Sequence, residues 1–207
     1  MKKVVSTIIA ASMMLAGVNA FAQISVGAGY LNSTYTTKYG DNKNSTNLNG
    51  AYVGAFYNVP LSGNFSVEPG LYVSYLGKKM TSDSYFGVSA STTRNEFALN
   101  VPINFKYNYA MAPDMAIFAY AGPTVYCGLS AKTSGAVTYL GTTTSNLYEG
   151  NMGRFDILLG GGLGFEVSRF VITAGYKYGL INRYTGSNSA NYKVHRGQLN
   201  LGVAYKF

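Results

Sequence analysis

The chain has 207 residues, of which 47% are apolar, 14% aromatic and only 12% charged. Soluble domains carry about 25% charged residues, so this sequence is unusually poor in solubilising charge. Its single cysteine excludes a disulfide scaffold and a thiolate metal cluster, and its many aromatic residues argue against disorder.

The N-terminal segment has the layout of a secretory signal peptide. Two lysines precede an apolar stretch (4–17), and the small residues of a cleavage site follow at 20–22. The alternative is an uncleaved anchor helix, but the apolar stretch is shorter than the ~20 residues that a membrane-spanning helix needs. We therefore expect residues 1–22 to be removed on export and residues 23–207 to form one domain.

In the rest of the chain, apolar residues alternate with polar or small ones. The clearest segments are 65–75, 96–107, 154–167, 170–180 and 198–207, and less regular ones lie near 24–36, 47–58 and 115–129. A period of two is typical of β-strands. The segments exceed the ~5–6 residues of an average strand and suffice for the ~9–11 residues with which a tilted strand crosses hydrocarbon. The sequence therefore predicts an all-β fold, an eight-stranded antiparallel transmembrane β-barrel built as an up-and-down meander.

The links between these segments alternate in length. Short turns fall at 60–64, 110–114 and 168–169, and longer polar links fall at 37–46, 79–93, 130–151 and 184–193. Short periplasmic turns and long extracellular loops are typical of outer-membrane barrels. We therefore expect four extracellular loops, with both termini in the periplasm.

Polar residues on the inward face indicate what fills the barrel. Eight strands leave an interior just wide enough for side chains. The predicted polar network of the lumen is Glu68, Glu96, Lys106, Arg154, Asp156, Glu166, Lys177 and Lys206. Its four acids and four bases can neutralise one another, as charges removed from water must. The alternative is a narrow proton or ion path through the same residues.

Aromatic residues gather near the ends of the predicted strands, as expected where a barrel meets the two membrane interfaces. On the loop side they are Tyr30, Tyr75, Phe97, Phe155 and Tyr178. On the turn side they are Phe56, Phe65, Phe105, Tyr107, Tyr109, Phe165, Phe170, Tyr205 and Phe207.

The C-terminus ends in phenylalanine, with apolar residues at alternate positions: Leu201, Val203, Tyr205 and Phe207. This segment resembles the insertion signal that the barrel-assembly machinery recognises in bacterial outer-membrane proteins. The whole of 23–207 resembles the small porin-family barrels of Bacteroidota, which are similar in architecture to OmpX and the membrane domain of OmpA. The resemblance implies the outer membrane of a Gram-negative bacterium and a monomer without an open pore.

Few residues suggest catalysis. The only histidine, His195, lies near the loop rim, and Asp83-Ser84 lies in a long link. Small outer-membrane enzymes that modify lipid A resemble this chain in size and use a histidine with a serine and an acid, which keeps this class as an alternative. A nucleophile needs its base within hydrogen-bond reach, and nothing in the spacing establishes that. We therefore expect no catalytic residue, no metal and no cofactor.

Positive charge is concentrated in and beside the long links. The bases there are Lys38, Lys43, Lys78, Lys79, Arg94, Lys132, Arg154, Arg183, Lys193 and Arg196. From these we predict a basic outer rim of Lys78, Lys79, Arg94, Arg183, Lys193 and Arg196 that contacts the phosphates of lipopolysaccharide. The alternative is a merely solvated rim, and nucleic acid is not an expected partner of an exported barrel.

The leading functional hypothesis is a barrel with a filled lumen that has a structural or surface-interaction role through its loops. A narrow solute or ion channel and a lipid A-modifying enzyme are the alternatives.

Overall fold

The computed structural model describes residues 23–82, 90–137, 141–186 and 191–207, so the predicted signal peptide lies outside the described part. The strands are β1 (Gln23–Tyr39), β2 (Asn42–Pro60), β3 (Phe65–Ser82), β4 (Ala90–Ala112), β5 (Met115–Val137), β6 (Gly141–Asn146), β7 (Phe155–Val167), β8 (Phe170–Gly179) and β9 (Tyr192–Lys206). No helix in the described ranges is long and apolar enough to cross a membrane.

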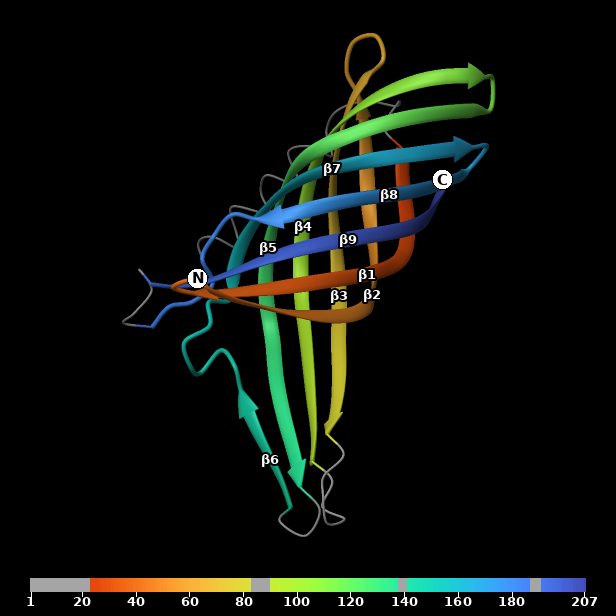
Figure 1. Cartoon of the computed structure of the whole chain (residues 1–207). Coiled ribbons are helices and arrows are strands. Elements are labelled where there is room, and N and C mark those ends of the chain that lie inside the picture. Colours follow the sequence, from red (N-terminus) through yellow and green to blue (C-terminus); the bar gives the residue numbers. More distant parts are fainter. Residues whose placement is uncertain (1–22, 83–89, 138–140, 187–190) are drawn as a thin grey trace, which may run out of the picture.

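Eight of these strands close into a ring (Figure 1). Each strand pairs antiparallel with its neighbours in the order β1, β2, β3, β4, β5, β7, β8 and β9, and β9 pairs again with β1. The remaining strand, β6, pairs with β5 beyond the ring. The predicted eight-stranded antiparallel barrel is therefore confirmed, with one additional strand.

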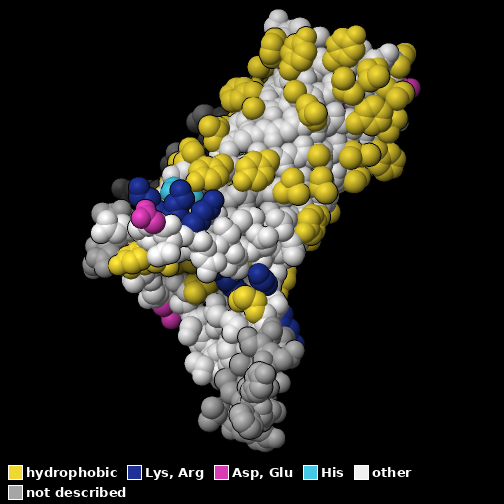
Figure 2. Space-filling view, viewed as in Figure 1, with side chains coloured by type: hydrophobic (Ala, Val, Ile, Leu, Met, Phe, Trp, Pro, Cys, Tyr) yellow, Lys and Arg dark blue, Asp and Glu magenta, His cyan; other side chains and the backbone are white. Residues whose placement is uncertain are grey.

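The two faces of the barrel wall differ in polarity. Outward side chains such as Leu163 and Val203 are more than half exposed, whereas inward ones such as Asn100 and Gln198 are buried. Hydrophobic side chains cover the visible outer surface at the turn end of the molecule (Figure 2). An apolar exterior around a polar interior is the arrangement that a bilayer requires of a barrel.

Three of the predicted loops are largely strand. The β1–β2 hairpin stays paired up to Tyr39 and Asn42, and Gly40 takes a φ of 54° in the two-residue turn that joins them. Likewise, β3 and β4 remain paired inside the predicted loop 79–93, as far as Ser82 and Ala90. In the predicted loop 130–151, the paired strands β5 and β6 occupy much of the segment. Both faces of these extensions are polar, so they lack the alternation that marks a half-buried strand, although their backbones still pair.

The strands of the loop end extend as two separate arms (Figure 1). Residues 33–39, 42–48 and 192–197 form the β1–β2 arm, and residues 78–82, 90–96, 131–137 and 141–146 form the β3–β6 arm. The arms diverge because the pairing between β2 and β3 ends at Asn49 and Gly77.

The loop-side aromatic residues lie on the outward face, where Tyr30, Tyr75, Phe97, Phe155 and Tyr178 are each at least 40% exposed. We call them the loop-side belt. On the turn side, Phe65, Phe105, Tyr107, Tyr109, Phe170 and Phe207 are also exposed. The prediction for Phe56 is wrong: it lines an internal cavity, because the missing side chain of Gly70 leaves room for its ring.

Candidate functional site

Glu96 is a carboxylate buried at the loop end of the lumen, where three tyrosines donate hydrogen bonds to it. Tyr35 on β1 donates at 2.5 Å, Tyr148 in the link between β6 and β7 donates at 3.0 Å, and Tyr126 on β5 also donates. Burial raises the pKa of Tyr148, the tyrosine outside the strands, so its hydroxyl stays protonated and can donate. These bonds supply the charged oxygens with polar partners away from water.

Two arginines complete this cluster. Nη2 of Arg183 lies 3.1 Å from Oε1 of Glu96, and the Arg196 guanidinium lies 3.7 Å from the centre of the Tyr126 ring. Both arginines are 0% exposed. We call the cluster of Tyr35, Glu96, Tyr126, Tyr148, Arg183 and Arg196 the loop-end plug. It joins strands from different sides of the ring to two links, and thereby fills the lumen at this level.

The prediction that Arg183 and Arg196 belong to the outer rim is therefore wrong. Arg196 and Gln198 are two residues apart and both lie on the inward face of β9. Because β9 begins at Tyr192, Arg196 belongs to this strand and not to the loop before it. Arg183 lies in the link after β8, and this link folds back into the barrel mouth, where the backbone of Arg183 pairs with Gly153 and Val194. The position of Arg183 in a link between strands did not predict that the link folds back.

Arg154 is also misplaced in the predicted lumen network. Arg154 is exposed, and its guanidinium lies 5.1 Å from the centre of the Tyr148 ring. It therefore contacts a tyrosine of the plug and does not lie among the inward acids. Because β7 begins at Phe155, the alternation of that strand does not extend to Arg154.

An apolar layer packs against the plug, and the alternation of side chains does not predict it. Leu31, Leu48, Leu76 and Val194 are buried in one cluster with Tyr35, and Met152 and Tyr184 from the two links pack against it. Three of these residues face inward from β1, β2 and β3. In β1 and β2 they make both faces of the strand partly apolar, which weakens the alternation there. Together, the plug and this layer fill the loop half of the lumen with buried side chains.

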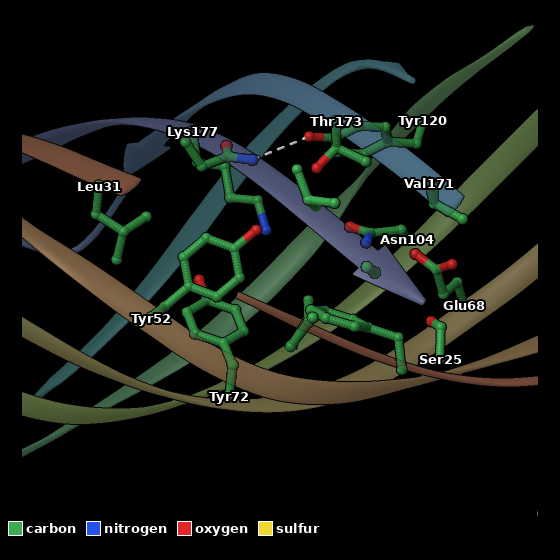
Figure 3. Close-up of a pocket in the computed structure, with 16 residues that line it drawn as sticks. Ser25, Leu31, Tyr52, Glu68, Tyr72, Asn104, Tyr120, Val171, Thr173 and Lys177 are labelled. Carbon is green, nitrogen blue, oxygen red and sulfur yellow. Dashed lines mark hydrogen bonds between the residues drawn. The ribbon is translucent and has the colours of Figure 1, made fainter. Parts of the chain in front are cut away.

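A small cavity of about 60 Å³ lies toward the middle of the barrel (Figure 3). Tyr52, Tyr72, Tyr120 and Lys177 are among its lining residues. Lys177 donates to Thr124 at 2.7 Å. The cavity can hold water, because its polar lining offers a molecule several hydrogen-bonding partners.

Glycines give the aromatic side chains their room in this part of the lumen. A Cβ on Gly164 would overlap the ring of Phe118, and one on Gly175 would overlap the hydroxyl of Tyr120. These glycines of β7 and β8 therefore serve close packing inside the barrel. The glycine-rich run at 160–164 resembles a phosphate-binding loop in composition, but such a loop needs a following helix, and β7 continues into the turn before β8.

Two lysine–glutamate pairs lie at the turn end. Lys106 lies 2.9 Å from Glu68, and Lys206 pairs with Glu166. All four side chains line a cavity of about 190 Å³, which we call the turn-end vestibule. Glu68 also lines the central cavity, so the polar lining continues between the two.

Asp156, the remaining predicted lumen acid, is 0% exposed and accepts a backbone hydrogen bond from Ile181 at 3.2 Å. The structure thus places Glu68, Glu96, Lys106, Asp156, Glu166, Lys177 and Lys206 inside the barrel. With Arg183 and Arg196 added and Arg154 removed, the inward bases outnumber the inward acids.

The other predicted rim residues are dispersed. Lys79 and Lys193 are exposed, Lys78 is half-buried, and Arg94 turns toward the plug with its guanidinium 4.7 Å from the centre of the Tyr35 ring. A single rim containing all the predicted residues is therefore not present. Exposed bases on the arms remain available to an external anion.

His195 is held by structural contacts. Its Nδ1 donates to the carbonyl oxygen of Gly179 at 3.1 Å, and its ring stacks on Tyr178 with 5.7 Å between centres. Asp83 and Ser84 lie outside the described residues. In the described ranges, no three histidine, cysteine or acidic side chains are grouped as a metal site would require, and Cys127 is a free thiol.

A closed antiparallel barrel with an apolar outer face and a polar filled interior defines an integral β-barrel membrane protein. The chain belongs to the outer membrane protein beta-barrel domain family, whose model matches residues 15–184. It is therefore a protein of the outer membrane of Gram-negative bacteria. Comparison with curated proteins finds no match.

Solved outer-membrane barrels resemble the chain at low sequence identity. Ail of Yersinia pestis, in complex with the heparin analogue sucrose octasulfate, is 16% identical with a TM-score of 0.48, covering 90% of this chain and 99% of Ail. Neisserial surface protein A is also 16% identical, with a TM-score of 0.46 and the same coverages. The outer membrane protease OmpT from Escherichia coli is 12% identical, with a TM-score of 0.47, covering 89% of this chain and 97% of OmpT.

Proposed function

We propose that the protein is a closed, monomeric outer-membrane barrel with a structural and surface-interaction role. In this proposal the turns and both termini lie in the periplasm, and the two arms extend outside the cell. The long links and strand extensions at one end, against short turns at the other, support this orientation.

The loop-end plug is the observation that carries the proposal. Glu96 is bonded to Arg183 and three tyrosines, and the apolar layer around them excludes water from the same level of the lumen. An ion crossing this level would have to separate a buried ion pair, which leaves uncompensated charge in a low-dielectric surround. A barrel built in this way does not conduct.

Single-channel recording in planar bilayers tests the closed lumen. We expect no steady conductance from the protein, whereas Arg183→Gly combined with Tyr148→Gly removes link-borne parts of the plug and should produce brief openings. Lys79→Gly combined with Lys132→Gly is the matched control, because it removes two exposed bases from the same end without touching the plug. A steady wild-type conductance that Glu68→Gln abolishes would contradict the proposal.

That result would favour the second candidate function, a narrow ion path. The specific observation behind it is the polar lining shared by the turn-end vestibule and the central cavity, which leads from the turn end to the plug. The same recordings decide between the two functions.

The proposal also holds that the protein is not an enzyme. The described contacts of His195 are with the backbone carbonyl of Gly179 and the ring of Tyr178, and neither is the serine or the acid that the lipid A-modifying alternative needs. Mass spectra of lipid A from cells with and without the protein should be identical. A mass change that His195→Ala removes would establish the lipid A-modifying alternative.

We further propose that the barrel-assembly machinery recognises the C-terminal strand. Leu201, Val203 and Phe207 are exposed at the end of β9, where another protein can contact them. Deletion of Phe207 should lower the amount of folded protein in the outer membrane of cells while leaving refolding in detergent unchanged. Equal losses in both settings would indicate a purely structural role.

A further inference from the structure

Three lysines form one row across the outer face of the β1–β2 arm. Lys38 on β1 lies directly opposite Lys43 on β2 and Lys193 on β9. All three side chains are exposed. Figure 2 shows basic side chains gathered beside the histidine on this face, consistent with His195 lying two residues from Lys193 on β9. We call Lys43, Lys38 and Lys193 the lysine row.

The row is unfavourable for the protein alone. Directly opposed residues of an antiparallel pair have Cβ atoms about 4.5–5.5 Å apart, and like charges at such positions are destabilising. Lys38 has a directly opposed lysine on each neighbouring strand, Lys43 on β2 and Lys193 on β9. In the part of the chain that the structure describes, none of the three lysines forms an ion pair, although Asp41 lies in the adjoining turn. Folding therefore holds three positive charges together, and the acid nearest to them in sequence, Asp41, pairs with none of them.

The spacing of the row suits a ligand with several anionic groups. Neighbouring strands lie about 4.8 Å apart, so the three ammonium groups are spread over about 10 Å at right angles to the strands. Two residues closer to the barrel, the same face of the three strands carries Thr36, Ser45 and His195. These side chains add hydrogen-bonding groups beside the lysine row. Phosphate groups carried on sugars match both sets of side chains.

The position of the row relative to the membrane limits the source of these anions. Tyr30 of the loop-side belt and Lys38 share the outward face of β1. At about 3.4 Å per residue and a strand tilt of about 40°, the row lies about 20 Å beyond the belt. A phospholipid headgroup layer is only about 5–8 Å thick. A lipid that reaches the row must therefore carry a long, anionic sugar chain.

We propose that the lysine row binds phosphate groups on the core sugars of the lipopolysaccharide that surrounds the barrel. The inference rests on the proposed orientation, with the arms outside the cell. The face that carries the row is continuous with the lipid-facing surface of the barrel, so the sugar chains of lipids packed against the barrel extend along this face as far as the row. The repulsion within the row is relieved when phosphates lie between the ammonium groups.

Titration of the purified barrel in detergent micelles tests this site with three probes. They are lipopolysaccharide with a phosphorylated core, the same lipopolysaccharide after removal of its core phosphates, and lipid A alone. The variant is Lys38→Gln/Lys193→Gln. The charge-matched control is Lys79→Gln/Lys132→Gln, because Lys79 and Lys132 are exposed on the other arm and lie opposite Thr93 and Asn95, which are uncharged.

We expect the row variant to lose about tenfold in affinity for the phosphorylated-core probe, the scale of two exposed charge pairs. The control should lose little, and neither variant should change in affinity for lipid A or the dephosphorylated probe. Equal losses in both variants would overturn the proposal in favour of general charge attraction. Unchanged binding of the phosphorylated-core probe in the row variant would also overturn it.

Orientation needs a separate measurement, so that its failure is distinguishable from failure of the site. The variant Asn44→Cys, in a Cys127→Ser background, should react with a membrane-impermeant thiol reagent on intact cells. If it does not react while binding in micelles follows the expected pattern, the proposed orientation is wrong and the chemistry of the row still holds. If it reacts but the micelle pattern fails, the row is not the site.

Discussion

The two halves of the lumen compensate their buried carboxylates with different partners. In the loop half, Glu96 is bonded to arginine and tyrosine side chains inside an apolar layer. In the turn half, lysine–glutamate pairs line a vestibule, and Glu68 retains 16% exposure of its side chain. Arginine forms several fixed hydrogen bonds and is weakly hydrated, whereas lysine is a strongly hydrated point charge. The difference indicates a dry seal at the loop end and a hydrated entrance at the turn end.

The largest expected effect is in the dry half. Arg183→Ala leaves the buried carboxylate of Glu96 without its ion-pair partner, which should lower the free energy of unfolding by about 3–5 kcal/mol. Urea titration in detergent, followed by the loss of heat-modifiable migration on gels, measures the change. Arg183→Met combined with Glu96→Gln removes both charges and should recover most of the loss. A loss below 1 kcal/mol would show that water reaches Glu96.

The corresponding change in the hydrated half should be smaller. Lys106→Met removes the partner of Glu68, but water in the vestibule can solvate the remaining carboxylate, so we expect a loss of about 1 kcal/mol. The same titration measures it. The contrast between the halves would disappear if Lys106→Met were as damaging as Arg183→Ala.

Thiol accessibility sharpens the comparison without a large change in stability. In a Cys127→Ser background, Asn58→Cys lies in the vestibule and Ser33→Cys lies in the dry half, where Ser33 is 0% exposed. A small water-soluble thiol reagent should label position 58 at least about tenfold faster, because reaction requires solvent access to the thiolate. Equal rates at the two positions would show a continuous aqueous path.

The alternation of side chains predicted the fold because the bilayer imposes it on every strand. Segments such as 96–107 and 198–207 contact lipid on one face and the lumen on the other, so their period of two is clear. The strand extensions in 37–46 and 130–151 contact water on both faces. Nothing requires alternation there, and the sequence indicated loops where the backbone continues to pair.

The lumen was predictable only where strands supply its side chains. Glu96 and Asp156 follow the alternation of β4 and β7 and were placed inside. Arg183 comes from a link, and its burial depends on a fold-back that brings Met152 and Tyr184 together as a bridge. Contacts between two links carry no periodic signal. The lysine row was equally hidden, because it arises only from the register of three strands.

The hydrogen bond between Tyr35 and Glu96 has a mechanical consequence. Tyr35 belongs to the β1–β2 arm and Glu96 to the β3–β6 arm, and the arms diverge just beyond this bond. A pull that spreads the arms therefore loads this bond, because it joins a residue of one arm to a residue of the other. Tension applied at the cell surface and the integrity of the seal are thus linked through one carboxylate.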